Sequence, residues 1–61
     1  SPKEMIDRLV IVSIKILLQN TDLSVKNIAA ELHFDDPPYM CRFFRRMTGM
    51  SPLEYRDSVK K

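Results

Sequence analysis

The stretch "MTGMSPLEYR" (residues 47–56) decides the fold, because it carries the signals for ending one helix and beginning another. Gly49 is the only glycine in the chain, and glycine adopts the left-handed conformation that closes a helix C-terminus without steric cost. Ser51 can cap the next helix, and Pro52 suits its first position, where no N–H is needed. Glu54, three residues after the cap, completes a capping box. The stretch therefore predicts a helix stop followed at once by a helix start.

The same pattern opens the chain. "SPKEMIDRL" (1–9) and "SPLEYRDSV" (51–59) share Ser, Pro, Glu and Asp at matching offsets. Two such copies suggest an internal repeat, with the end of one unit followed by the whole of the next. Chance is the alternative explanation, because these residue types are common wherever helices begin.

The composition indicates one small intracellular module. The chain has 61 residues, of which 44% are hydrophobic and 30% charged, a balance that argues against a membrane protein. A single cysteine, Cys41, excludes an internal disulfide and fits a reducing compartment. The apolar run at 9–18 is too short to span a bilayer, and no small-residue cleavage site follows it. We expect a cytoplasmic protein with no membrane partner.

Charge is distributed unevenly along the chain. Residues 1–41 carry four basic and six acidic side chains, a net charge of −2. Residues 42–61 carry six basic side chains, Lys61 among them, and two acidic ones, a net charge of +4. A basic C-terminal third is typical of a surface that meets nucleic acid or an acidic partner. A solvated helix surface is the alternative.

The first helix is expected to run from a cap at Ser1 to about Leu18. Its middle, "LVIVSIKILL" (9–18), is apolar at eight of ten positions. The β-branched residues there would also fit a buried strand, but the capping box and the length favour a helix. A helix that is apolar nearly all round must be covered on more than one side. We therefore expect a partner, or more of a parent chain, to pack against it.

The rest of the chain predicts three further helices. Ser24 is the expected cap of a short helix over "VKNIAAEL" (25–32), and Asp35 or Asp36 the cap of a third helix that begins with two prolines. A tight turn at 33–38 separates the two, which is the order of a helix-turn-helix. The core candidates are Ile28, Leu32, Phe34, Met40, Phe44, Met47 and Leu53.

Residues 21–56 resemble the second helix-turn-helix of the AraC/XylS family of bacterial transcription regulators. The matching features are Ile28-Ala29, Phe34, Tyr39, Arg42, Phe44, Gly49, Pro52 and Tyr55-Arg56. The opening residues resemble the end of that family's first helix-turn-helix and its long linking helix. The resemblance implies an all-α, homeodomain-like helix-turn-helix bundle of about four helices. Within it, 1–19 would be the linking helix and 20–61 the helix-turn-helix subdomain.

The chain departs from the family pattern at several positions. His33 stands where the family usually has a glycine in the turn. Val10 replaces a basic residue of the linking helix, and valine cannot contact a phosphate. Pro37 and Pro38 occupy positions where relatives often carry polar side chains that read bases.

The resemblance implies sequence-specific binding of double-stranded DNA, with the helix at about 36–47 in the major groove. Arg42 is expected to read a base, a phosphate contact or a surface ion pair being the alternatives. Arg45 and Arg46 fit phosphate contacts better. Tyr39 and Cys41 flank Arg42, although Tyr39 fits the core equally well. Asp36 could accept from cytosine, but capping is the favoured role.

Further contacts are expected at the start of the second helix, whose free N–H groups suit a phosphate. The resemblance gives Arg56 a structural or backbone-facing role. The predicted DNA-binding set is Ser24, Val25, Lys26, Asp36, Pro38, Tyr39, Cys41, Arg42, Arg45, Arg46 and Arg56. The further partners implied are the remainder of a parent regulator (a first helix-turn-helix and an effector or dimerisation domain) and RNA polymerase, and the implied location is the bacterial nucleoid.

Catalysis has little support in the sequence. There is one histidine and one cysteine, with no third ligand beside them, and no glycine-rich phosphate loop. We expect no enzyme activity, no cofactor and no metal. The alternative function is a protein–protein interaction module derived from a helix-turn-helix, which the strongly apolar first helix favours.

Overall fold

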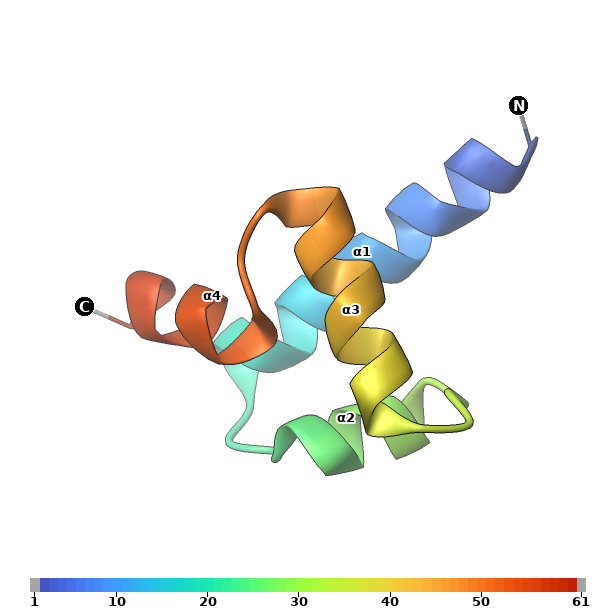
Figure 1. Ribbon diagram of the computed structural model, residues 1–61. Helices are drawn as coiled ribbons and strands as arrows, with labels where there is room; N and C mark the ends of the chain where they lie inside the picture. The colour runs from blue at the N-terminus through green and yellow to red at the C-terminus, as the bar shows by residue number, and fades with distance from the viewer. Residues whose placement is uncertain (1, 61) are drawn as a thin grey trace.

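The computed structural model describes residues 2–60, which fold into four α-helices with no strand among them (Figure 1). The helices are α1 (Pro2–Asn20), α2 (Val25–Glu31), α3 (Pro37–Thr48) and α4 (Pro52–Val59). In Figure 1, α3 crosses in front of α1, α2 lies below them, and α4 lies beside the C-terminal half of α1. The predicted all-α helix-turn-helix bundle is confirmed. The division at residues 19 and 20 stays a prediction, and the expected cap at Ser1 lies outside the described residues.

Local capping signals set where the helices begin. The Ser24 side chain accepts a hydrogen bond from the Asn27 N–H at 3.1 Å, and Asp36 does the same for the Tyr39 N–H. Of the two candidate caps for α3, the structure therefore uses Asp36. Ser51 and Glu54 form the complete predicted capping box at the start of α4. Each cap satisfies helix N–H groups that have no partner within the helix.

The hydrophobic core is formed by one side of each of the helices α1, α2 and α3. Its buried members are Ile11, Ile14, Leu18, Ile28, Ala29, Met40, Phe43 and Phe44. Helix α4 closes the core through buried Pro52 and through Tyr55, whose ring packs edge-on against Phe44 with the centroids 5.7 Å apart. Since α1 contributes to the same core as the other helices, residues 2–60 form a single packed unit.

Two core expectations are wrong. Met47 is 43% exposed and Leu53 is 61% exposed. Met47 lies in the last turn of α3, beyond the part of the helix that supplies the buried residues. Leu53 follows Pro52, and since successive helix positions turn by about 100°, burying Pro52 directs Leu53 away from the core. Leu32 and Phe34 are half-buried and pack against the core edge.

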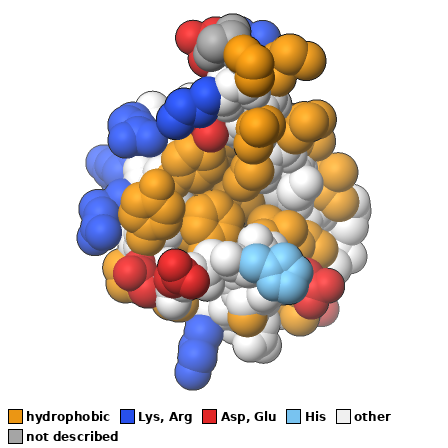
Figure 2. All heavy atoms as spheres, turned by 90° about the vertical axis from the view of Figure 1, so that its right-hand side faces the viewer, with side chains coloured by type: hydrophobic (Ala, Val, Ile, Leu, Met, Phe, Trp, Pro, Cys, Tyr) orange, Lys and Arg blue, Asp and Glu red, His pale blue; other side chains and the backbone are white. Residues whose placement is uncertain are grey.

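Among residues 2–60, the other three helices cover only one side of α1. Met5, Leu9, Val12 and Ile16 are all at least half exposed and recur every three or four residues, which places them on one stripe. Figure 2 shows hydrophobic side chains gathered over the face that carries the N-terminal half of α1. The expected second cover of this helix is therefore not supplied by the other three helices.

The turn between α2 and α3 places a histidine in the left-handed region. His33 has φ 64°, and it is the one non-glycine residue with positive φ between residues 2 and 60. Its N–H donates to the Ala30 carbonyl at 3.1 Å, and the Phe34 N–H donates to the Ala29 carbonyl at 2.8 Å. These hydrogen bonds end α2 with a residue in the left-handed conformation, a position that glycine usually occupies. Gly49, with φ 83°, ends α3 in the same conformation without a side chain.

The turn predicts that His33→Gly stabilises the chain. Relief of left-handed strain is worth about 1–2 kcal/mol, and the greater freedom of glycine in the unfolded chain costs about 0.5–1 kcal/mol. The free energy of unfolding should therefore rise by about 0.5–1 kcal/mol, measured by urea denaturation of the 61-residue chain. His33→Ala is the control and should bring no gain, because alanine keeps the Cβ that causes the strain. A lower urea midpoint for the glycine variant would contradict the prediction.

Candidate nucleic-acid interface

An aromatic cluster holds the turn against α3. The Phe34 ring lies 6.1 Å, centroid to centroid, from both Tyr39 and Phe43. Such tilted ring pairs stabilise by more than their buried area alone. Phe34 follows the turn, and Tyr39 and Phe43 lie one helical turn apart on α3. The cluster therefore packs the residue after the turn against the first half of α3.

The arginines of α3 lie on the side that faces away from the core. Met40, Phe43 and Phe44 are buried, and with about 100° per residue the opposite side carries positions 38, 42 and 45. Pro38, Arg42 and Arg45 are indeed exposed. The fold therefore presents two guanidinium groups and one proline on a single helix face.

Residues at the edges of this face have mixed surroundings. Tyr39 is 53% exposed while its ring packs on Phe34, so it belongs in part to both of its predicted environments. Cys41 is half-buried. The Arg46 guanidinium lies 5.9 Å from the centroid of the Phe43 ring, in cation–π contact. Arg46 is thus oriented by an aromatic neighbour, unlike Arg42.

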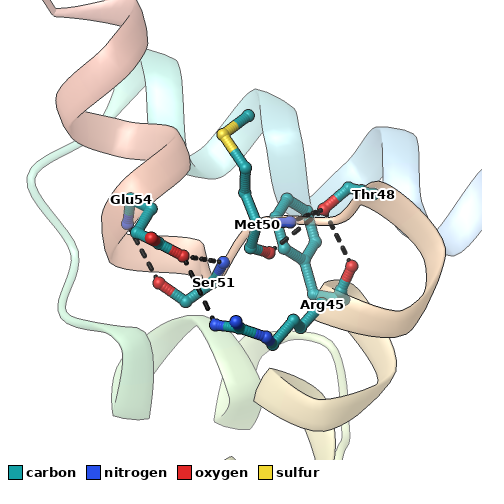
Figure 3. A network of polar contacts seen from close by, with 6 residues as sticks. Arg45, Thr48, Met50, Ser51 and Glu54 are labelled. Atoms are coloured by element: carbon teal, nitrogen blue, oxygen red, sulfur yellow. Dashed lines mark hydrogen bonds and ion pairs between the residues drawn. The ribbon is translucent and has the colours of Figure 1, made fainter.

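Arg45 meets a carboxylate from the next helix (Figure 3). Its Nη1 lies 3.5 Å from Glu54 Oε1, and the same carboxylate oxygen accepts the Ser51 N–H at 2.8 Å. Sequence reasoning missed this pair, because the two residues lie on different helices and only the angle between α3 and α4 brings them together. The Ser51 backbone N–H, then the Ser51 hydroxyl, holds the pKa of Glu54 below its ordinary value of 4.5, and Arg45 adds a weaker effect.

The corner between α3 and α4 is fixed by Thr48. Its hydroxyl oxygen lies 2.9 Å from the Phe44 carbonyl and 3.1 Å from the Met50 carbonyl, which share its single proton, and it accepts the Met50 N–H. Figure 3 shows these bonds beside the capping box of Ser51 and Glu54. The position of Glu54 relative to α3 is therefore set by hydrogen bonds along a short segment of backbone.

The Arg56 side chain forms hydrogen bonds with the backbone at the end of α1. It is half-buried, its Nε donates to the Leu18 carbonyl at 3.1 Å, and its Nη2 donates to the Thr21 carbonyl at 3.3 Å. Leu18 lies in the last turn of α1, where helix carbonyls lack partners, and Thr21 follows the end of the helix directly. Arg56 thus joins α4 to the end of α1. Its predicted place in the DNA-binding set stays a prediction.

The remaining predicted residues lie at helix starts. Ser24 and Asp36 are exposed and use their side chains as caps. Val25 is half-buried and packs against the core, whereas Lys26 is exposed. The structure thus places Lys26 and the N–H groups of the first turn of α2 beside one another at the surface.

Residues 2–60 contain no group of three or more His, Cys, Asp or Glu side chains placed to hold a metal ion. Among the same residues, no helix is long and apolar enough to cross a membrane.

A family model described as a helix-turn-helix domain matches residues 1–58. The chain belongs to the AraC-type helix-turn-helix family. It is therefore a DNA-binding domain of the type found in transcription regulators.

Curated relatives agree with this membership. The chain is similar to the uncharacterized HTH-type transcriptional regulator YijO of Escherichia coli K12, with 50% identity over 69% of this chain and 15% of the relative. The arabinose operon regulatory protein of the same strain is 37% identical over 77% of this chain and 16% of the relative. The transcriptional activator RhaR of Enterobacter sp. 638 is 38% identical over 74% and 16%. The matched part of the chain thus covers about a sixth of the length of each of these relatives, and no solved structure matches the chain.

The lowered pKa of Glu54 predicts a loss of stability in acid. Because the carboxylate is favoured in the folded chain, its contribution is present above the ordinary pKa of 4.5 and is lost as pH falls through the lower folded pKa. Asp22, whose pKa is lowered by a hydrogen bond and charge from Lys60, acts in the same direction. In urea denaturation from pH 6 to pH 2.5, we expect Glu54→Gln and Asp22→Asn each to flatten the acid decline. An unchanged decline in both variants would contradict this assignment.

Proposed function

We propose that residues 24–46 bind duplex DNA sequence-specifically, with α3 in the major groove, as part of a bacterial transcription regulator. The observation that carries the proposal is the outward face of α3, where Pro38, Arg42 and Arg45 are exposed opposite a fully buried side. A single α-helix fits the major groove of B-DNA, where each base pair presents a distinct pattern of donors and acceptors. An α3 buried on one side and basic on the other suits that groove.

Within this proposal, Arg42 reads a base. It lies at the middle of the exposed face, and no carboxylate between residues 2 and 60 pairs with it. A free guanidinium matches the two acceptors on the guanine edge. Tyr39 and Cys41 flank it, and Pro38, which has no donor, can supply only an apolar contact such as one to a thymine methyl group.

Phosphate contacts supply most of the affinity. Arg45 and Arg46 lie in the second half of α3, and Lys26 lies at the exposed start of α2. Each phosphate that a protein neutralises contributes about −0.9 to the slope of log affinity against log salt. A few such contacts give a slope of roughly −2 to −5 and modest affinity for one helix-turn-helix.

Replacing Arg42 and Arg46 by alanine tests the proposal. Fluorescence anisotropy with a labelled duplex, titrated across salt, should show binding by the parent chain and at least ten-fold weaker binding by the double variant. The slope of log affinity against log salt should be shallower by up to the contribution of about two phosphate contacts. Lys3→Ala is the matched charge control: Lys3 is exposed on α1, where it pairs with Asp7, and its loss should leave binding nearly unchanged. A double variant that is folded and binds duplex as tightly as the parent would contradict the DNA-binding proposal.

The exposed stripe of α1 favours a second candidate role, an interaction surface. Met5, Leu9, Val12 and Ile16 follow a four-three-four spacing, which is the seam pattern of packed helices. We infer that this stripe contacts the remainder of a parent regulator, its first helix-turn-helix or a further domain, since the segments matched by this chain make up only 15% and 16% of two such relatives. RNA polymerase is a partner that the family resemblance alone supports.

The stripe predicts that Leu9→Gln with Val12→Gln has different effects in two contexts. In the 61-residue chain both side chains are at least half exposed, so the free energy of unfolding should change by less than about 0.5 kcal/mol. In a full-length regulator that carries this domain, the loss should be about 1–3 kcal/mol, followed by chemical denaturation. Arg8→Gln, on the same helix, serves as the control. Equal and small effects in both contexts would mean that nothing covers the stripe.

A further inference from the structure

The ion pair between Arg45 and Glu54 lies at the edge of the proposed DNA-binding face. Arg45 projects from the same side of α3 as Arg42, and its guanidinium lies 3.5 Å from the carboxylate of Glu54 at the start of α4 (Figure 3). The two side chains are 66% and 59% exposed. Both are therefore accessible to a polyanion that approaches α3.

Glu54 does not depend on Arg45 for its position. Its Oε1 accepts the Ser51 N–H at 2.8 Å, and its own N–H donates to the Ser51 hydroxyl at 3.1 Å. The Thr48 hydrogen bonds hold the preceding corner. A negative charge is thus kept beside Arg45 whether or not Arg45 turns toward it, so that a DNA phosphate must compete with it for the guanidinium.

We propose that Glu54 is a positioning residue that competes with DNA phosphates for Arg45 and so lowers the affinity of the domain for DNA of any sequence. The inference rests on the DNA-binding function proposed above. Arg42 has no such partner between residues 2 and 60. The pair therefore weakens a phosphate contact and leaves the predicted base contact unchanged. Because specificity is the difference between two affinities, a penalty that is the same for all sequences lowers the affinity and leaves the discrimination between sequences unchanged.

The size of the effect follows from the exposure of the pair. Exposed ion pairs change an equilibrium by roughly 1.5- to 5-fold. A phosphate that binds an already neutralised arginine also releases less counterion. Glu54 should therefore reduce both the affinity for random duplex and the steepness of its salt dependence.

Glu54→Gln separates the charge from the cap, because glutamine keeps a side-chain oxygen for the Ser51 N–H. Anisotropy with a labelled random duplex should show Glu54→Gln binding about 2- to 5-fold tighter than the parent, with a salt slope steeper by up to about one phosphate. In an Arg45→Ala background the same substitution should bring at most a small gain. Asp57→Asn removes an equal charge from α4 at a residue with no ion pair among residues 2–60, and any gain there should be independent of Arg45. Thermal melting checks that each variant is folded.

Two results would overturn the inference. One is weaker or unchanged binding by Glu54→Gln. The other is an equal gain with and without Arg45, which would assign the effect to general repulsion. Elution from immobilised heparin is measured in parallel, where Glu54→Gln should elute at higher salt only when Arg45 is present. If the parent binds heparin but not duplex, the DNA function fails, while the heparin comparison still decides whether Glu54 competes for Arg45.

Discussion

The structure depends on the burial of one side of α3. Met40, Phe43 and Phe44 are the side chains that α3 contributes to the core, and Phe44 is fully buried. A twelve-residue helix that buries three apolar residues on one side presents the opposite side to solvent. Arg42 and Arg45 are exposed for this reason. The hydrophobic contacts that stabilise the bundle and the exposed basic face that we propose as the DNA contact are two sides of one helix.

Helix α4 and the corner before it connect α3 to α1. Arg56 joins α4 to the carbonyls at the end of α1, and Tyr55 packs on Phe44. The Thr48 corner and the capping box then place Glu54 beside Arg45. Helix α4, which makes no predicted base contact, thus places a negative charge beside α3, the helix predicted to contact bases. In this domain, the same residue caps α4 and forms an ion pair with an exposed arginine of α3.

Much of the fold could be predicted, because its signals act over three or four residues. Ser24, Asp36 and Ser51 cap the helices that they precede, and Gly49 ends α3 in the left-handed conformation. The core was predicted less well, since Met47 and Leu53 are exposed. Helical spacing shows which residues share a side, but it does not show how far along each helix the neighbouring helices reach.

The sequence by itself determined the class of the domain, the starts of α2, α3 and α4, and the concentration of arginines in the second half of the chain. Local hydrogen bonds and backbone preferences are written in adjacent residues, so they need no knowledge of the fold. Tertiary structure alone decided that Glu54 meets Arg45 and that Arg56 reaches Leu18, which is 38 positions away. It also decided that one stripe of α1 stays uncovered by the other helices. These contacts depend on the angles at which packed helices cross, and no local pattern of residues specifies those angles.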